Sequence, residues 1–260
     1  MQRLLVTFAL LIFGVADPAS AADLRARPVA KAPIQTAIPA VADWSGFYVG
    51  VHGGGSAADA TYDFADPFPA NHYNRLAGDR FTHGLSGALF GGHAGFNWQW
   101  SQIVLGVEAS GGWANLSGTA ISPFFPLTDT FHSRVKWISS LTARVGIAAG
   151  PALLYVKGGA AWAGIDTRLQ DTGDFNQRSG TASGWTAGAG IEYLLMRSVV
   201  LGVEADYYDF GVCCGGRSES LSLFGGAPIG QFSTHDTSVT AWSVLGRLSY
   251  KFGSPVVASY

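Results

Sequence analysis

The amino-acid sequence predicts an all-β fold, an eight-stranded antiparallel up-and-down β-barrel that crosses a membrane. Charged residues make up only 13% of the 260 residues, whereas soluble domains contain about 25%. After the N-terminal region no run of about 18 consecutive apolar residues occurs, so a transmembrane helix is not expected. From Trp44 onward, apolar residues instead recur at every second position, which is the period of a β-strand.

The first element of the chain is a targeting segment at residues 1–21. It has a basic start at Arg3, an apolar stretch over 4–16 and a small-residue site that ends at Ala21. These parts are typical of a secretory signal peptide, and the apolar stretch is too short to span a bilayer. We expect cleavage after Ala21, with Ala22 as the second choice, and therefore export.

Three further regions follow the targeting segment. Residues 22–42 are rich in alanine and proline and lack any period, so a flexible periplasmic leader is expected. Residues 43–252 hold the predicted barrel. Residues 253–260 form a short C-terminal extension, in which Pro255 disfavours continued strand pairing.

The predicted strands are segments with one apolar row each. In chain order they span about 44–55, 84–100, 102–114, 133–149, 152–166, 183–196, 198–209 and 239–252. The first four rows are Phe47, Val49, Val51; Ala88, Phe90, Ala94, Phe96, Trp98, Trp100; Ile103, Leu105, Val107, Ala109, Trp113; and Val135, Trp137, Leu141, Ala143, Val145, Ile147. The last four are Leu154, Val156, Ala160, Trp162; Trp185, Ala187, Ala189, Ile191, Tyr193; Val199, Leu201, Val203, Ala205, Tyr207; and Trp242, Val244, Leu248, Tyr250, Phe252.

None of these apolar rows contains a charged residue. A soluble barrel would place its large apolar residues inside and its charges in water, so the bulky rows must here face hydrocarbon. The opposite rows, rich in glycine, serine and threonine, then face the interior. They carry a predicted network of paired lumen charges: Glu108, Arg144, Lys157, Glu192, Glu204, Asp206, Arg247 and Lys251.

The links between the segments alternate in length. Short links are predicted at 101–102, 150–151 and 196–198, and long links at 56–83, 115–132, 167–182 and 210–238. Outer-membrane barrels have short periplasmic turns and longer outer loops, so the long links are expected to face the cell exterior.

The tryptophans fall into two groups by this topology. Amphipathic aromatic rings favour headgroup depth, so two aromatic girdles are predicted. The outer girdle comprises Trp113, Trp137, Trp162, Trp185 and Trp242, and the periplasmic girdle comprises Trp44, Trp98 and Trp100.

Four motifs carry a family resemblance. They read WSGFYVGVHGGG from Trp44, LGVEAS at 105–110 with LGVEAD at 201–206, ARVGIAAGPALLYVKGGAAWA at 143–163, and LGRLSYKF at 245–252. The set resembles the opacity-protein-like, porin-related outer-membrane surface antigens, in particular the small major outer-membrane proteins of rhizobia and brucellae. The resemblance implies an eight-stranded OmpA-like barrel with a structural or surface role. Members commonly end at the last strand's aromatic residue, whereas this chain continues past Phe252.

Candidate ligand-binding residues are few. The glycine clusters at 50–55 and 91–95 lack the strand–turn–helix context of a phosphate loop. His52 and His93 fall on inward rows, where hydrogen-bonded lumen histidines are more common than metal ligands. Because some members of the resembling family are associated with haemin binding, the resemblance implies weak haem candidates among histidines in or beside the long links: His72, His83, His132 and His235. No cofactor and no metal site is predicted.

The expected function is structural and surface-exposed, and an enzyme is not expected. Asp129, His132 and Ser133 are close in sequence, but no catalytic motif surrounds them. Cys213 and Cys214 are adjacent, and as a predicted loop pair they cannot cross-link distant segments. The formal net charge of −2 gives no reason to expect nucleic-acid binding.

The expected partners are outer-membrane lipid and lipopolysaccharide, the barrel-insertion machinery, and a host surface or phage. The leading hypothesis is a barrel that supports envelope integrity and displays four long loops. A small passive pore and a haem- or ligand-binding barrel are the alternatives.

Overall fold

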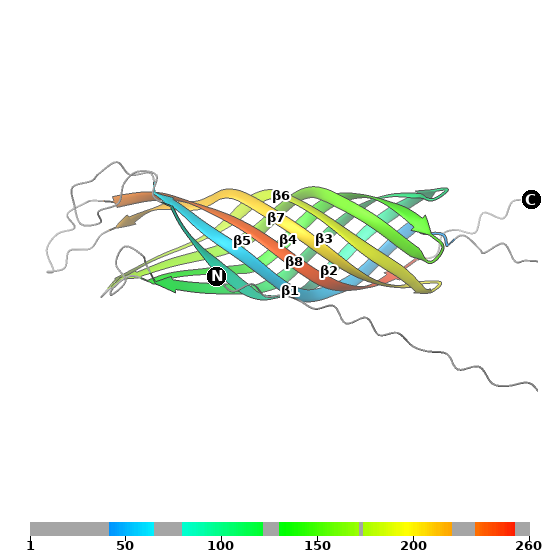
Figure 1. Ribbon diagram of the computed structural model, residues 1–260, viewed down its shortest axis with the longest axis horizontal. Helices are drawn as coiled ribbons and strands as arrows, with labels where there is room; N and C mark the ends of the chain where they lie inside the picture. The colour runs from blue at the N-terminus through cyan, green and yellow to red at the C-terminus, as the bar shows by residue number, and fades with distance from the viewer. Residues whose placement is uncertain (1–41, 65–79, 122–129, 172–173, 220–231, 253–260) are drawn as a thin grey trace, which may run out of the picture. The chain divides into compact units, whose positions relative to one another are not determined.

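The computed structural model describes residues 42–64, 80–121, 130–171, 174–219 and 232–252, and in them the predicted eight-stranded antiparallel barrel is confirmed. The strands are β1 (Gly46–Phe64), β2 (Arg80–Trp100), β3 (Ile103–Ile121), β4 (Thr130–Ala149), β5 (Ala152–Asp171), β6 (Asp174–Met196), β7 (Val199–Glu219) and β8 (Phe232–Lys251). Each strand pairs with its neighbour in sequence, and β1 pairs with β8 to close the ring (Figure 1). In these ranges no helix is long and apolar enough to cross a membrane.

The strands extend farther than the sequence pattern indicated, but they do so at only one end of the barrel. The short links predicted at 101–102, 150–151 and 196–198 lie where strands end, and we call this the short-turn end. At the opposite end the predicted links were too long, because the strands extend into each of them: strands cover 56–64, 80–83, 115–121, 130–132, 167–171, 174–182, 210–219 and 232–238. Cys213 and Cys214 therefore lie in β7 rather than in a loop.

Alternation of side chains across the strands produces an apolar outer band. Leu105, Val145, Leu201 and Val244 are exposed on the outside, as the predicted apolar rows require. Val135 is an exception: it is 0% exposed and packs inside. The register of β4 shifts against both neighbouring strands between Val135 and Trp137, and a bulge of this kind reverses which face the next side chain takes.

The barrel interior changes character along its length. Near the middle it holds the charged side chains. Toward the end opposite the short turns, which we call the far end, it holds a cluster of buried apolar residues that includes Leu116, Phe131, Val135, Ile165 and Phe210. The expectation that the inner rows are small and polar throughout was therefore wrong for this half. Beyond the lipid there is no hydrocarbon to face, so the strands bury apolar side chains inward, as a soluble barrel does.

Candidate functional site

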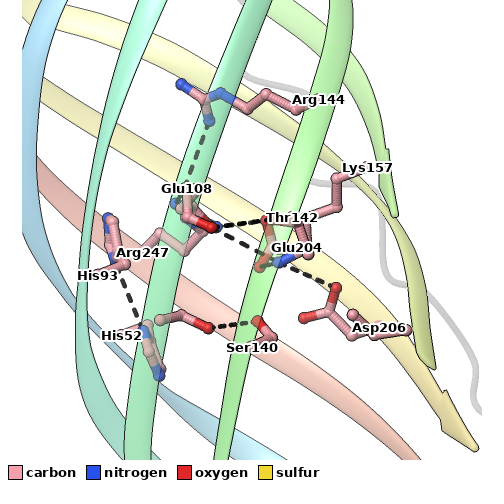
Figure 2. Close-up of polar contacts among 12 residues, drawn as sticks. His52, His93, Glu108, Ser140, Thr142, Arg144, Lys157, Glu204, Asp206 and Arg247 are labelled. Carbon is pink, nitrogen blue, oxygen red and sulfur yellow. Dashed lines mark hydrogen bonds and ion pairs between the residues drawn. The ribbon is translucent and has the colours of Figure 1, made fainter. Parts of the chain in front are cut away.

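The centre of the lumen is occupied by a network of ion pairs. Arg247 on β8 donates from Nη1 to Glu108 Oε1 on β3 at 3.0 Å, and its guanidinium also hydrogen-bonds Glu108 Oε2 and Glu204 on β7. β8 and β3 are not neighbours in the sheet, so the contact between Arg247 and Glu108 crosses the lumen (Figure 2). Glu204 lies on β7, which pairs with β8. Arg247 thereby ties opposite walls of the barrel together.

Two further cations complete the network. Lys157 Nζ lies 2.7 Å from Glu204 Oε1, 3.2 Å from Asp206 Oδ1 and 3.7 Å from Glu108 Oε1. Arg144 Nη1 lies 3.2 Å from Glu192 Oε1 and 3.7 Å from Glu108 Oε2. Its Nε donates to Asn97 Oδ1 at 2.9 Å. Buried charges of this kind are stable only when each is paired, and every charge named here has a partner of opposite sign.

Two buried tyrosines extend the network, and the sequence analysis did not single them out. Tyr48 donates to Glu108 Oε2 at 2.8 Å, and Tyr155 donates to Glu204 Oε2 at 2.5 Å. The Arg144 guanidinium lies over both rings, at 4.5 and 5.0 Å from their centroids. A Cβ at position 190 would come within 2.5 Å of the Tyr155 hydroxyl, so Gly190 on the neighbouring β6 leaves the space in which this ring passes over that strand to Glu204 on β7. The sequence feature that could have identified Tyr48 and Tyr155 is their position on the inward-facing rows of the first and fifth strands.

A pair of histidines lies beside the network. His52 and His93 stack with ring centroids 5.6 Å apart, and their Nδ1 atoms are 3.3 Å apart. His93 Nε2 also lies 2.7 Å from the hydroxyl of Ser249. Within the described ranges no group of three or more His, Cys, Asp and Glu side chains is placed to hold a metal ion.

Lys251 is buried but does not share in the ion pairs of the other seven lumen charges. Its ammonium donates to the backbone carbonyl of Asp43, near the short-turn end. The prediction that Lys251 belongs to the lumen charge network was therefore wrong. Because Lys251 is the last residue of β8, its side chain meets the segment that enters β1 and not the centre of the lumen.

Trp44 closes the short-turn end from inside and was wrongly placed in the periplasmic girdle. Its side chain is 1% exposed and packs with Val104, Leu153, Tyr155 and other buried side chains at this end. Its backbone N–H donates to Gln99 Oε1 at 2.6 Å. The alternation of β1 begins only at Gly46, so the face that Trp44 presents could not be deduced from the strand period.

The other tryptophans lie on the outer surface. Trp98, Trp100, Trp113, Trp162, Trp185 and Trp242 are exposed, and Trp137 is half-buried. Tyr207 lies between two of them, with ring centroids 5.4 Å from Trp185 and 4.6 Å from Trp242. Trp113 pairs with Trp137 across β3 and β4. We call the rings toward the end opposite the short turns the aromatic row: Trp113, Trp137, Trp162, Trp185, Tyr207 and Trp242. The strands continue well beyond this row, which is therefore not at their tips.

Of the four haem candidates the structure describes two side chains, those of His83 and His132, which lie on opposite faces of the barrel wall. His83 is buried and stacks against the rings of Tyr62 and Phe81, whereas His132 faces outward and its Nδ1 lies 2.9 Å from the Thr119 hydroxyl. Both lie on strands, as does His235, whose side chain is not described, and His72 lies outside the described residues.

Of the residues considered for catalysis, His132 and Ser133 lie on β4 and not in a loop, and their side chains point to opposite faces of the strand. Ser133 is buried 2.7 Å from the Tyr62 hydroxyl, on the opposite face of β4 from its neighbour His132. Asp129 lies outside the described residues.

Comparison with known proteins agrees with this architecture. Residues 8–252 match the family described as outer membrane protein beta-barrel domain. The chain is 32% identical over 180 residues to a 22 kDa outer membrane protein of Rhizobium leguminosarum bv. viciae, and the aligned region covers 69% of each chain. It is 28% identical over 175 residues to a 31 kDa outer-membrane immunogenic protein of Brucella melitensis, covering 65% of this chain and 72% of the relative.

Among solved structures, OprG from Pseudomonas aeruginosa aligns with a TM-score of 0.44 at 11% identity, over 81% of this chain and 97% of that one. The resemblance to rhizobial and brucella outer-membrane proteins is confirmed by the sequence relatives. With its closed antiparallel barrel and apolar outer band, the chain belongs to the outer membrane protein β-barrel family and is a protein of the bacterial outer membrane.

Proposed function

We propose that the protein is a structural barrel that supports envelope integrity and presents its far strand ends and connections at the cell surface. The observation that carries this proposal is the side-chain network that occupies the lumen, centred on Arg247, Glu108 and Glu204. A side chain that bridges opposite walls stabilises the barrel as one unit and leaves its interior unavailable for transport.

A passive pore would need a continuous water path through the barrel. Three successive layers of buried side chains oppose it: Trp44 with its apolar neighbours, the ion-pair network, and the apolar cluster around Leu116 and Phe210. An eight-stranded barrel is only just wide enough for side chains to fill it. These layers support the structural role over the pore.

The orientation that we propose places the short-turn end in the periplasm and the other end outside the cell. Both ends of the barrel segment, at β1 and β8, lie at the short-turn end, which suits a chain exported from the periplasmic side. The proposed partners are the lipid and lipopolysaccharide around the barrel and the insertion machinery in the periplasm. A host surface or a phage is the proposed partner at the exposed end.

Deletion of the gene tests this role. A deletion strain should leak a periplasmic reporter enzyme and become sensitive to detergent, and wild-type protein expressed from a plasmid should reverse both effects. A deletion strain with an intact permeability barrier but slower uptake of small solutes would contradict the structural role and favour the pore.

A further inference from the structure

Charged side chains are unevenly distributed around the outside of the barrel beyond the aromatic row. Among the outward side chains that the structure describes there, β4 and β5 carry Arg134, Lys136 and Arg168 against one carboxylate, Asp166. The sector formed by β7, β8 and β1 carries acidic residues instead: Asp209, Asp236, Asp59 and Asp63. We call the first group the β4–β5 basic strip.

A bulge in β4 sets the basic strip directly against the aromatic row. Val135 and Ile138 both point inward, at 0% and 4% exposed, so the two residues between them, Lys136 and Trp137, face outward together. A Cβ at Gly164 would lie 2.2 Å from Trp137 Nε1, which shows that the indole rests on that glycine. The ring is thus fixed against the barrel wall, with an ammonium on the neighbouring residue.

The side chains of the strip are held in place by neighbours. Lys136 Nζ lies 2.7 Å from Asp166 Oδ2, and Arg134 Nη2 donates to Asn115 Oδ1 at 3.0 Å. In the strand register, Arg134 is opposite Asp166, and Arg168 is opposite His132. Arg134 and Lys136 share one described carboxylate, Asp166, so this pair of cations keeps a positive surplus. An Arg guanidinium has five N–H donors in a planar fork, and the single bond to Asn115 leaves the others for an anion.

The height of the strip matches the headgroup region of a bilayer. Arg134 is three residues beyond Trp137, which for a strand rise of about 3.3 Å and a tilt of about 40° places it about 8 Å farther along the membrane normal. The polar region of a bilayer leaflet is about 5–8 Å deep, and interfacial tryptophans sit at headgroup depth, so Lys136 lies within this region and Arg134 lies toward its outer edge. The cations therefore lie where the anionic groups of the surrounding lipid lie.

We propose that the β4–β5 basic strip binds the phosphate groups of lipid A, the glycolipid anchor of lipopolysaccharide in the outer leaflet. Arg134 and Lys136 hydrogen-bond the phosphate, and Trp137 packs beside the sugar and the first carbons of the acyl chains. Arginine and lysine are the side chains that recognise phosphate in proteins. The proposal rests on the orientation given above, and it identifies one sector of the barrel as the place where lipopolysaccharide is held.

Native mass spectrometry of the purified, folded chain with bisphosphorylated lipid A tests the proposal. Chelator is included, so that divalent ions cannot bridge phosphates to the acidic sector. The double variant R134Q/K136Q should bind lipid A at least about 10-fold more weakly, a loss of about 1.4 kcal/mol, because it lacks the charged donors that hydrogen-bond the phosphate. Heat-modifiable gel mobility reports whether the variant is folded.

The matched control is R80Q. Arg80 is also an outward arginine paired with a carboxylate, Asp63, at 2.5 Å, but it lies ten residues beyond Phe90 on β2, about 25 Å farther along the normal than that ring. It should leave lipid A binding unchanged. A second arm uses wild-type protein with dephosphorylated lipid A, which should bind about as weakly as the double variant binds the phosphorylated form.

Three results would overturn the proposal. The first is equal affinity of R134Q/K136Q and R80Q for lipid A, and the second is equal affinity of the wild type for both forms of lipid A. The third is equal affinity of the wild type for phosphatidylglycerol, which would make the strip a general contact for anionic lipid. The second and third results need no variant, so a folding failure would not leave the idea untested. Each would leave the structural role of the barrel standing, because that role depends on the deletion phenotype.

Discussion

Arg247 and Glu108 meet across the lumen from strands that do not pair, with Nη1 donating to Oε1 at 3.0 Å. Three cations, Arg144, Lys157 and Arg247, share this centre with four carboxylates: Glu108, Glu192, Glu204 and Asp206. The carboxylates are not equivalent. Glu108 lies within 4 Å of all three cations, whereas Asp206 contacts Lys157 and accepts a hydrogen bond from Tyr208 at 3.3 Å.

Neutralising Glu108 should therefore destabilise the barrel strongly. The variant Glu108→Gln leaves buried cations with fewer partners, and breaking a buried pair costs about 3–5 kcal/mol. Because four carboxylates face three cations, one carboxylate is in excess, and Asp206 has the fewest cation contacts. The matched variant Asp206→Asn should therefore cost less than half of the free energy that Glu108→Gln costs. Urea unfolding in lipid vesicles, followed by tryptophan fluorescence, measures both. Equal costs would show that the two carboxylates are equally well paired.

Truncating the ion pair should not open a channel. In Glu108→Ala with Arg247→Ala, Trp44 and the apolar cluster around Phe210 still occupy the two ends of the lumen. We expect the double variant to lose stability but to show no large, steady current in planar bilayers. A steady open conductance in this variant would mean that the charged layer alone blocks the lumen.

Trp44 and Trp98 provide a matched pair, one inside and one outside. Trp44 is 1% exposed and Trp98 is 70% exposed. Trp44→Ala should cost about 3–5 kcal/mol, the range for removing a buried aromatic side chain. Trp98→Ala should cost less than half as much in the same unfolding assay. A larger cost at Trp98 would indicate that lipid-facing rings, rather than the inner plug, dominate stability at this end.

The outer band should reject charge in its middle and accept it beyond its edge. Val145→Arg places a cation against hydrocarbon and should cost about 2–4 kcal/mol, the range for the midplane of a membrane barrel. Thr181→Arg lies on the outer face of β6, beyond Trp185, and should cost less than about 1 kcal/mol. Folding into vesicles at a series of urea concentrations compares them. Similar costs would place the hydrocarbon boundary elsewhere.

The orientation can be tested on intact cells. An epitope tag inserted within 65–79 should be stained without permeabilisation, because we expect that end to be outside. A tag inserted at 150–151, in a turn at the short-turn end, should be stained only after the outer membrane is opened. Staining of the second tag on intact cells would reverse the topology and remove the basis for lipid A binding.

The sequence by itself determined the barrel, its strand number and the inward placement of the charges. Hydrocarbon accepts no charge, so a strict period of two is imposed on every strand inside the lipid, and Val145 or Leu201 can be assigned to a face from the pattern alone. Where that constraint ends, the pattern ends too. The pattern therefore predicts loops at the far strand ends, whereas β1 continues to Phe64 and β7 to Glu219.

Only the tertiary structure decided the features that depend on contacts between distant strands. The bulge that turns Val135 inward and sets Lys136 beside Trp137 arises from register shifts against two neighbouring strands, which no local period encodes. The partners of Glu108 come from β1, β4, β5 and β8. A carboxylate on an inward row is visible in the sequence, but which cation reaches it depends on how the closed barrel aligns its strands.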